Sequence, residues 1–149
     1  MGIKIIFSNK KAFHNFQIGE RYEAGMVLKG TEIKALRAGK VNLGDGWIDI
    51  TGEEEAILKD AYIGHYEFGN RMNHEERRPR KLLLHKKEIL KLSHLAESKG
   101  YSIVPIKIYF KGQRVKLEIG LGKGKKLYDK RETSKKRTAD REMERALKL

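Results

Sequence analysis

Apolar and polar residues alternate in two neighbouring segments near the end of the chain, 104–110 and 115–121, with the turn 111–113 between them. A period of two is typical of strands that bury one face, so this pattern predicts a β-hairpin. Pro105 cannot donate a ladder hydrogen bond, which predicts an edge or a bulge at its position.

The same alternation, in weaker form, predicts further strands. Residues 22–28 read as a half-buried strand, and turn residues bound two more candidates at 47–50 and 56–63. The first eight residues carry few signals. Residues 12–18 predict a segment that wraps onto the core.

Two segments carry helix signals. Thr31 is a candidate N-cap for a short helix that ends at Ala38, and Gly39 follows where a C-terminal glycine is expected. A longer helix is predicted from Lys86 to Lys99, with Gly100 as its stop. Its apolar stripe consists of Ile89, Leu92, Leu95 and Ala96.

Five or six short antiparallel strands, with a helix before the last hairpin, predict a mainly β chain. The expected architecture is an OB-like antiparallel β-barrel with flanking helices. A sandwich of helices on one sheet is the alternative. We expect residues 1–121 to form the body and residues 122–149 a flexible basic tail.

The charge of the chain changes this picture. The formal net charge is +13, and residues 120–149 hold eleven Lys/Arg against five Asp/Glu. A segment with so few core-forming side chains is predicted to be disordered on its own. A basic body with a cationic arm indicates a polyanionic partner, either nucleic acid or a membrane surface.

The composition also argues against several classes of protein. No run of 18 apolar residues occurs and no signal-peptide core follows Met1, so we expect neither a membrane span nor secretion. The chain has no cysteine, which excludes disulfides and thiolate metal sites and suits the cytoplasm. No cofactor or metal is expected.

Candidate catalytic motifs are weak. The glycines at 120, 122 and 124 precede lysines but lack the spacing and the Ser/Thr of a nucleotide-binding P-loop, so we interpret them as flexible backbone. The five histidines show no metal-ligand spacing. A metal-free nuclease built on His14, Glu23 and His85 is an enzymatic alternative.

Cationic and aromatic residues offer binding candidates. Lys34 and Arg37 share a face of the short helix, which by itself is typical of a solvated surface. The cluster Arg71, Arg77, Arg78, Arg80 and Lys81 favours an anionic partner, because like charges repel. Most aromatic residues are expected in the core, and Tyr128 in the tail is the exception.

Several motifs recur in order along the chain. They are Asn9-Lys10-Lys11-Ala12-x-His14, Glu23-Ala24-Gly25, Gly30-Thr31-Glu32-Ile33-Lys34-Ala35-Leu36-Arg37-Ala38-Gly39-Lys40, Arg80-Lys81-Leu82-Leu83-Leu84-His85, Val104-Pro105 and Gly124-Lys125-Lys126-x-Tyr128-Asp129-Lys130-Arg131. Together they resemble the SsrA-binding protein (small protein B) family, the bacterial partner of transfer-messenger RNA. The resemblance covers nearly the whole chain.

This resemblance implies an OB-like barrel and a non-enzymatic adaptor role in trans-translation. The body would bind the tRNA-like domain of transfer-messenger RNA, mainly around its D-loop. The RNA would then be delivered to ribosomes stalled on messages that lack a stop codon. The implied partners are transfer-messenger RNA and the rRNA of the small ribosomal subunit, with no membrane and no small-molecule substrate. We expect a monomer in the bacterial cytoplasm.

The resemblance also implies site residues. RNA contacts map onto Asn9, Lys10, Lys11, His14, Glu23, Lys34, Arg37, Lys81, Leu83, His85, Lys123, Lys125 and Lys126. The tail would place Tyr128, Asp129, Lys130 and Arg131 in the decoding centre, with Lys135, Lys136, Arg137, Arg141 and Arg145 along the mRNA channel, as a helix that forms on the ribosome. No role is carried over to the loop 67–78.

Two hypotheses of other kinds remain open at this point. One is the nuclease described above, and the other is a ribosomal or initiation-factor-like OB protein that binds rRNA. The adaptor hypothesis further predicts that the segments 9–14, 34–37 and 81–85 share one face of the body.

Overall fold

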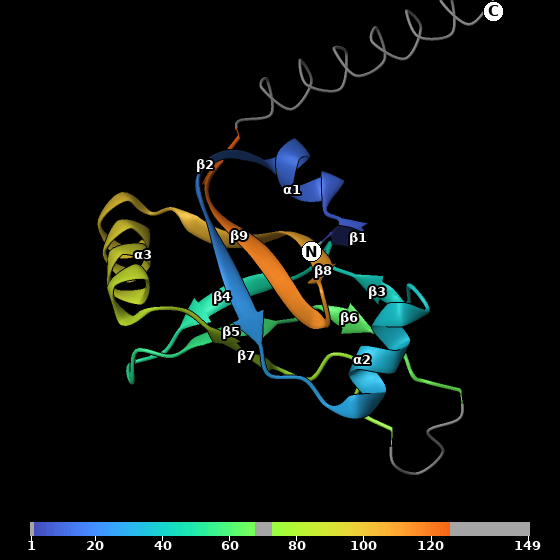
Figure 1. Ribbon diagram of the computed structural model, residues 1–149. Coiled ribbons are helices and arrows are strands. Elements are labelled where there is room, and N and C mark those ends of the chain that lie inside the picture. Colours follow the sequence, from blue (N-terminus) through green and yellow to red (C-terminus); the bar gives the residue numbers. More distant parts are fainter. Residues whose placement is uncertain (1, 68–72, 126–149) are drawn as a thin grey trace, which may run out of the picture.

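The computed structural model describes residues 2–67 and 73–125 (Figure 1). In chain order its elements are β1 (Ile3–Ser8), α1 (Lys10–Asn15), β2 (Phe16–Met26), α2 (Gly30–Arg37), β3 (Val41–Asn42), β4 (Trp47–Ile50), β5 (Ala56–Lys59), β6 (Tyr62–Ile63), β7 (Arg80–Leu83), α3 (Lys86–Lys99), β8 (Ser102–Lys111) and β9 (Arg114–Gly124).

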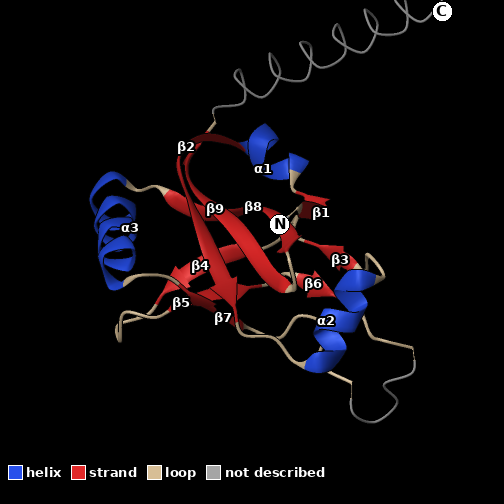
Figure 2. Ribbon diagram, viewed as in Figure 1, coloured by secondary structure: helices blue, strands red, loops and turns tan. Residues whose placement is uncertain are grey.

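Seven of these strands form one antiparallel sheet in the order β1-β8-β9-β2-β7-β5-β4, and β3 pairs with β6 in a small second sheet. The large sheet curls, so that β4 at one edge packs against β8 near the other edge. The three helices lie around its outside (Figure 2). The predicted mainly antiparallel, OB-like architecture is therefore confirmed.

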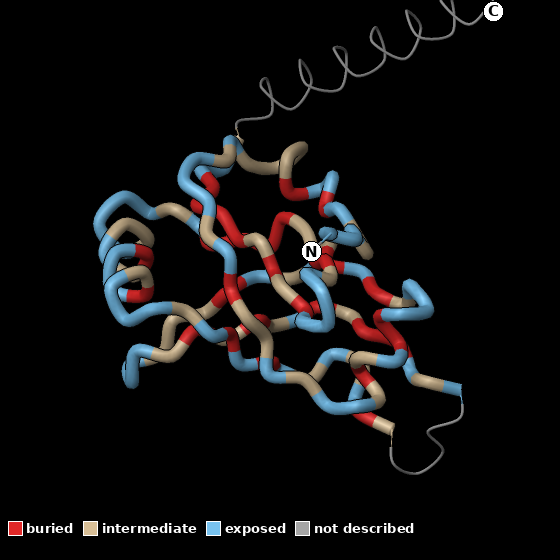
Figure 3. The backbone as a smooth tube through the Cα atoms, in the orientation of Figure 1, coloured by how far each residue is buried: buried red, intermediate tan, exposed pale blue. Residues whose placement is uncertain are grey.

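The core lies inside the curled sheet, as the buried stretches along the central strands show (Figure 3). Ile108, Leu117 and Ile119 from the β8–β9 hairpin are fully buried there, and Leu36 of α2 and Leu92 of α3 complete the cluster. The alternating residues of β8 and β9 thus point inward, as a half-buried strand requires.

Several sequence predictions hold. The helix α3 spans Lys86–Lys99, and Gly100 ends it in the left-handed conformation at φ +64°. Gly39 likewise follows α2 at φ +75°. The register between β8 and β9 shifts between Pro105 and Lys107, which confirms the bulge predicted at Pro105.

Other elements differ from the prediction. The first residues form β1, which pairs with β8, and residues 10–15 form the helix α1. The predicted strand 56–63 is two strands, because Asp60 adopts a positive φ of 58° and turns the chain. Arg80 and Lys81 of the cationic cluster lie in a strand that the alternation did not predict, β7 (Arg80–Leu83), which runs between β2 and β5.

The glycines of β9 correct a further prediction. The strand continues past Leu121 to Gly124, and Gly120 and Gly122 are buried within it. A Cβ at Gly120 would lie 2.6 Å from Ile106 Cδ1, and one at Gly122 would lie 2.9 Å from Phe16 Cβ. These glycines are therefore close-packing positions in a sheet and not flexible backbone.

Within the described ranges, no helix is long and apolar enough to cross a membrane.

Candidate nucleic-acid interface

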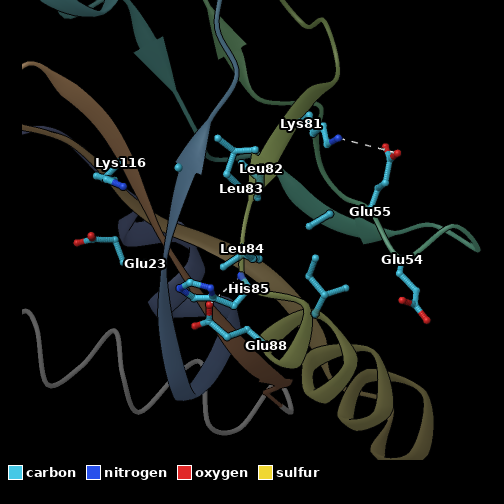
Figure 4. A pocket seen from close by; sticks show the side chains of 13 residues that line it. Glu23, Glu54, Glu55, Lys81, Leu82, Leu83, Leu84, His85, Glu88 and Lys116 are labelled. Carbon is cyan, nitrogen blue, oxygen red and sulfur yellow. Dashed lines mark hydrogen bonds and ion pairs between the residues drawn. The ribbon is translucent and has the colours of Figure 1, made fainter.

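An open groove of about 560 Å³ lies between β2, β7 and the start of α3 (Figure 4). Four of the predicted contact residues line it, namely Glu23, Lys81, Leu83 and His85. Glu23 comes from one motif and the other three residues from a second motif, and the pairing of β2 with β7 brings the two motifs together. Figure 4 shows Glu23 and Lys116 on one side of the groove and Lys81 with Glu55 on the other.

Glu23 stands in the groove as an anion. The Tyr109 hydroxyl donates to its Oε2, and Lys111 Nζ lies 3.4 Å from its Oε1. The Tyr109 hydrogen bond and the neighbouring lysines hold the pKa of the Glu23 carboxyl below its ordinary value, against a smaller opposing effect of burial. A carboxylate only accepts hydrogen bonds and repels phosphate, so it suits the N–H groups of a nucleobase or a ribose hydroxyl.

Leu83 presents an apolar surface beside this carboxylate. It is 54% exposed, which is high for a leucine in a paired strand. Its partner in register on β2 is Gly25, and a Cβ at Gly25 would lie 3.3 Å from Leu83 Cβ. The bare backbone of Gly25 thus leaves room for Leu83, whose exposed face can contact a base or a ribose.

His85 and Lys81 complete the groove. His85 is exposed at the N-cap position of α3, where Glu88 Oε1 accepts from its backbone N–H at 3.1 Å. Lys81 Nζ lies 4.0 Å from Glu55 Oε1, and both side chains are largely exposed. An exposed ion pair of this length contributes little to stability, so Lys81 is available to an anionic ligand.

The α1 segment requires a correction at Asn9. This side chain is 3% exposed, its Nδ2 donates to the carbonyls of Pro105 (2.8 Å) and Leu43 (3.3 Å), and its Oδ1 accepts from Ala12 N. With both ends of the amide engaged inside the protein, Asn9 caps α1 and fixes it on β8. Lys10 and Lys11 are exposed, and Lys11 forms a 3.0 Å ion pair with Asp45.

The α2 segment presents Lys34 and Arg37 on its exposed side. The Lys34 ammonium lies 5.1 Å from the centre of the Tyr66 ring, within the range of a cation–π contact. Tyr66 itself is fixed by Asn73, whose side chain bonds both its backbone N–H and its carbonyl. Lys34 is therefore presented beside an aromatic ring whose backbone Asn73 holds.

The end of β9 presents Lys123 and Lys125, the last of the predicted RNA contacts that the structure describes. Lys123 is exposed within the strand, opposite Gln17. The backbone N–H of Lys125 donates to Asn15 O, and its Nζ donates to Phe13 O at 3.0 Å, which ties the end of β9 to α1. Lys126 and all the tail residues named above lie outside the described residues.

The predicted residues thus occupy separate places. In Figure 1, α1, α2 and the junction of β7 with α3 lie at three different corners of the body, and they do not form one compact site. An RNA that contacts all three must span the domain. His14 on α1 lies outside the lining of the groove that holds Glu23 and His85, so the residues of the nuclease hypothesis do not meet in one pocket.

Three arginines of the predicted cationic cluster meet carboxylates that the sequence patterns did not pair with them, and Arg71 of the same cluster lies outside the described residues. Arg80 is fully buried and bonded to Glu32, Arg78 also bonds Glu32, and Arg77 lies 3.6 Å from Asp45. Sequence analysis also missed Tyr109, Lys111 and Lys116 around Glu23. The alternation of β8 placed Tyr109 out of phase with its core residues, but no local signal linked it to Glu23.

Comparison with known proteins identifies relatives over the whole chain. The family model described as SmpB protein matches residues 6–149. The SsrA-binding protein of Geobacter metallireducens is 55% identical over 148 residues, covering 99% of this chain and 96% of its own. That of Geobacter sulfurreducens is 57% identical with the same coverage, and that of Carboxydothermus hydrogenoformans is 54% identical over 145 residues, 97% of each chain.

A solved structure supports the same relationship. A chain reported under "tmRNA-SmpB: a journey to the center of the bacterial ribosome" superimposes with a TM-score of 0.69 at 45% sequence identity. The match covers 81% of this chain and 85% of that chain.

Proposed function

The chain belongs to the SmpB protein family, and we propose that it works as an RNA-binding adaptor of trans-translation. It binds the tRNA-like domain of transfer-messenger RNA and brings this RNA to stalled ribosomes. The SsrA-binding relatives and the tmRNA-SmpB structure support this assignment over an rRNA-binding protein of another class.

The observation that carries the proposal is the groove between β2, β7 and α3. It combines a carboxylate, an exposed leucine, a histidine and lysines in one open site. A site that bound phosphate alone would not place Glu23 among its cations. Glu23 therefore accepts hydrogen bonds from a base edge or a ribose, and Leu83 contacts the apolar face of the same nucleotide. Lys81 and Lys116 meet phosphates.

The exposed cations outside the groove supply a second part of the affinity. Lys10, Lys34, Arg37 and Lys123 are exposed at different corners of the body. Such lysines and arginines neutralise phosphates and release counterions, without reading sequence. The groove then gives the specificity and the surrounding cations fix the orientation of the RNA.

The test compares Glu23→Gln with Glu53→Gln in full-length protein. The substitution at Glu23 keeps the shape and the acceptor for Tyr109 but loses the charge, so affinity for the transcribed tRNA-like domain should fall about tenfold. Affinity for an unrelated RNA hairpin of equal length should not fall. Glu53 is exposed in the turn between β4 and β5, and its substitution is the matched control.

A rise in affinity for both RNAs after Glu23→Gln would contradict this role, because it would show that Glu23 only repels phosphates. Equal losses in the Glu53→Gln control would show that the loss does not depend on the groove.

The tail proposal rests on the sequence alone. Tyr128 to Arg131 occupy the decoding centre in place of a codon–anticodon pair, and the later cations line the mRNA channel. Replacing Asp129, Lys130 and Arg131 with alanine should abolish peptide tagging on stalled ribosomes while sparing binding of the tRNA-like domain. Tagging and RNA binding are measured on the same preparations.

The matched control is Lys148→Ala, which lies outside both proposed contact sets and lowers the net charge of the tail by one, as the triple substitution does (one acidic and two basic residues removed). This variant should retain measurable tagging. If both variants lose tagging equally, the tail acts as a cationic tether and the decoding role is wrong.

A further inference from the structure

A buried ionic network fastens the inner side of α2 to the barrel. Glu32 is fully buried, its Oε2 lies 2.5 Å from Arg80 Nε, and its Oε1 accepts from Arg78 Nη2 and, at 2.8 Å, from Lys29 N. Arg80 is also fully buried. The carboxylate is thereby held from two directions, by the loop before β7 and by β7 itself.

Arg80 extends the network to two more segments. Its Nη1 donates to Ala61 O at 2.7 Å, and its Nη2 donates to Glu76 O at 3.0 Å. One guanidinium therefore connects α2, the turn between β5 and β6, and the loop that follows β6. The planar fork of arginine makes this possible, because a lysine could not donate in these fixed directions.

A second connection lies one residue away on the helix. Thr31 Oγ1 is 2.9 Å from His74 Nδ1, and His74 Nε2 is 2.9 Å from Ile63 O. A carbonyl only accepts, so Nε2 carries the proton, and in the neutral ring Nδ1 accepts from the threonine hydroxyl. His74 is 2% exposed, and this histidine joins the first turn of α2 to β6.

These connections fix the rotation of the helix that carries Lys34 and Arg37. Each residue advances about 100° around an α-helix, so Lys34 lies on the side opposite Glu32. Any rotation of α2 about its axis moves the exposed cations together with the buried side. Replacing a buried ion pair with apolar residues often leaves stability unchanged or improved, so stability alone does not account for this network.

We propose that Glu32, Arg78, Arg80, Thr31 and His74, here called the α2 clamp, are positioning residues that orient Lys34 and Arg37 toward RNA phosphates. This inference rests on the proposed function, because it concerns how the same RNA is held. The clamp residues themselves do not touch the RNA.

The test is a double-mutant cycle with Thr31→Val, which keeps the shape of the side chain and removes the hydroxyl. In the otherwise unchanged protein this substitution should weaken binding of the tRNA-like domain about fivefold. In a Lys34→Ala/Arg37→Ala background the same substitution should cost less than about twofold, because the cations it orients are gone. Thr31→Ser, which retains the hydroxyl, should bind like the unchanged protein.

Hydrogen exchange supplies a readout that does not depend on RNA. In Thr31→Val the backbone amides of α2 should exchange faster, while those of β8 and β9 keep their rates. Equal losses of affinity in both backgrounds, or unchanged exchange in α2, would overturn the clamp. If the unchanged protein failed to bind the RNA, the proposed function would fail, and the exchange rates would still decide whether the clamp holds α2.

Discussion

Glu23 and Glu32 lie on neighbouring elements, β2 and α2, and both carboxyl groups have a pKa below the ordinary value. Their surroundings differ. The Glu23 side chain is 38% exposed and faces a groove, whereas Glu32 is 0% exposed and faces two arginines. Burial alone would raise the pKa of Glu32, but hydrogen bonds from Arg78, Lys29 N and Arg80 outweigh it.

The comparison shows how burial assigns a role to a charged group. Water can replace the partners of Glu23, so this carboxylate is available to a ligand at little cost. Nothing replaces the partners of Glu32, so its charge is committed to the fold. A glutamate within a basic protein can therefore belong to the binding surface or to the framework that supports it.

Glu32→Gln should give the largest effect that follows from this difference. It leaves the Arg80 charge buried without its counter-charge, which should lower the free energy of unfolding by about 3–5 kcal/mol. Urea denaturation followed by circular dichroism measures the loss. Glu23→Gln, at an exposed site, should change the free energy of unfolding by less than about 0.5 kcal/mol. Similar losses in both variants would remove the distinction between the two sites.

Leu82 and Leu83 test the same contrast with apolar side chains in one strand. Leu82 is 2% exposed and Leu83 is 54% exposed. Leu82→Ala should therefore cost about 2–5 kcal/mol of stability through the cavity it leaves. Leu83→Ala should leave the melting temperature nearly unchanged but weaken binding of the tRNA-like domain. If Leu83→Ala destabilised the protein as Leu82→Ala does, the exposed leucine would be part of the framework.

The two carboxylates should also differ in how strongly each makes stability depend on pH, and we expect this difference to be smaller than the losses of stability above. The pKa of Glu32 in the folded protein is below the ordinary 4.5, so its contribution is complete above that value and is lost as the pH falls through the folded pKa. The melting temperature should thus fall on acidification from about pH 6 to about pH 3. Glu32→Gln should show a shallower fall than Glu23→Gln when both are scanned by calorimetry, and equal slopes would contradict this.

Lys81→Ala should have the smallest effect on stability, because its ion pair with Glu55 is long and exposed. Its effect should appear in the salt dependence of RNA binding, where the slope of log affinity against log salt should decrease by about 1. Lys4→Ala on β1, away from the groove, is the control and should leave the slope unchanged. An unchanged slope for Lys81→Ala would exclude a phosphate contact at this lysine.

Local sequence signals were reliable where one pattern ran for many residues. The β8–β9 hairpin and α3 were predicted because their apolar periodicity is regular and their ends carry turn or glycine signals. The strand β7 was missed because it has only four residues and begins with a buried arginine. A charged residue in that position normally indicates a loop.

The candidate site was predicted as a set of residues and not as a geometry. Resemblance placed Glu23, Leu83 and His85 among the contacts, and the structure places them in one groove. Resemblance also placed Asn9 among the RNA contacts, yet the Asn9 side chain is buried against Leu43 and Pro105. A polar residue in a shared motif can serve the fold or the ligand, and spacing alone does not distinguish the two.

The sequence by itself determined the family, the basic character of the chain, and the helices and strands that have long regular patterns. These depend on residues close together in the chain. Only the tertiary structure decided which charges are committed internally, that Gly120 and Gly122 make room for Ile106 and Phe16, and that Glu32 meets an arginine 48 residues away. These partnerships form between distant segments, and a local pattern does not specify them.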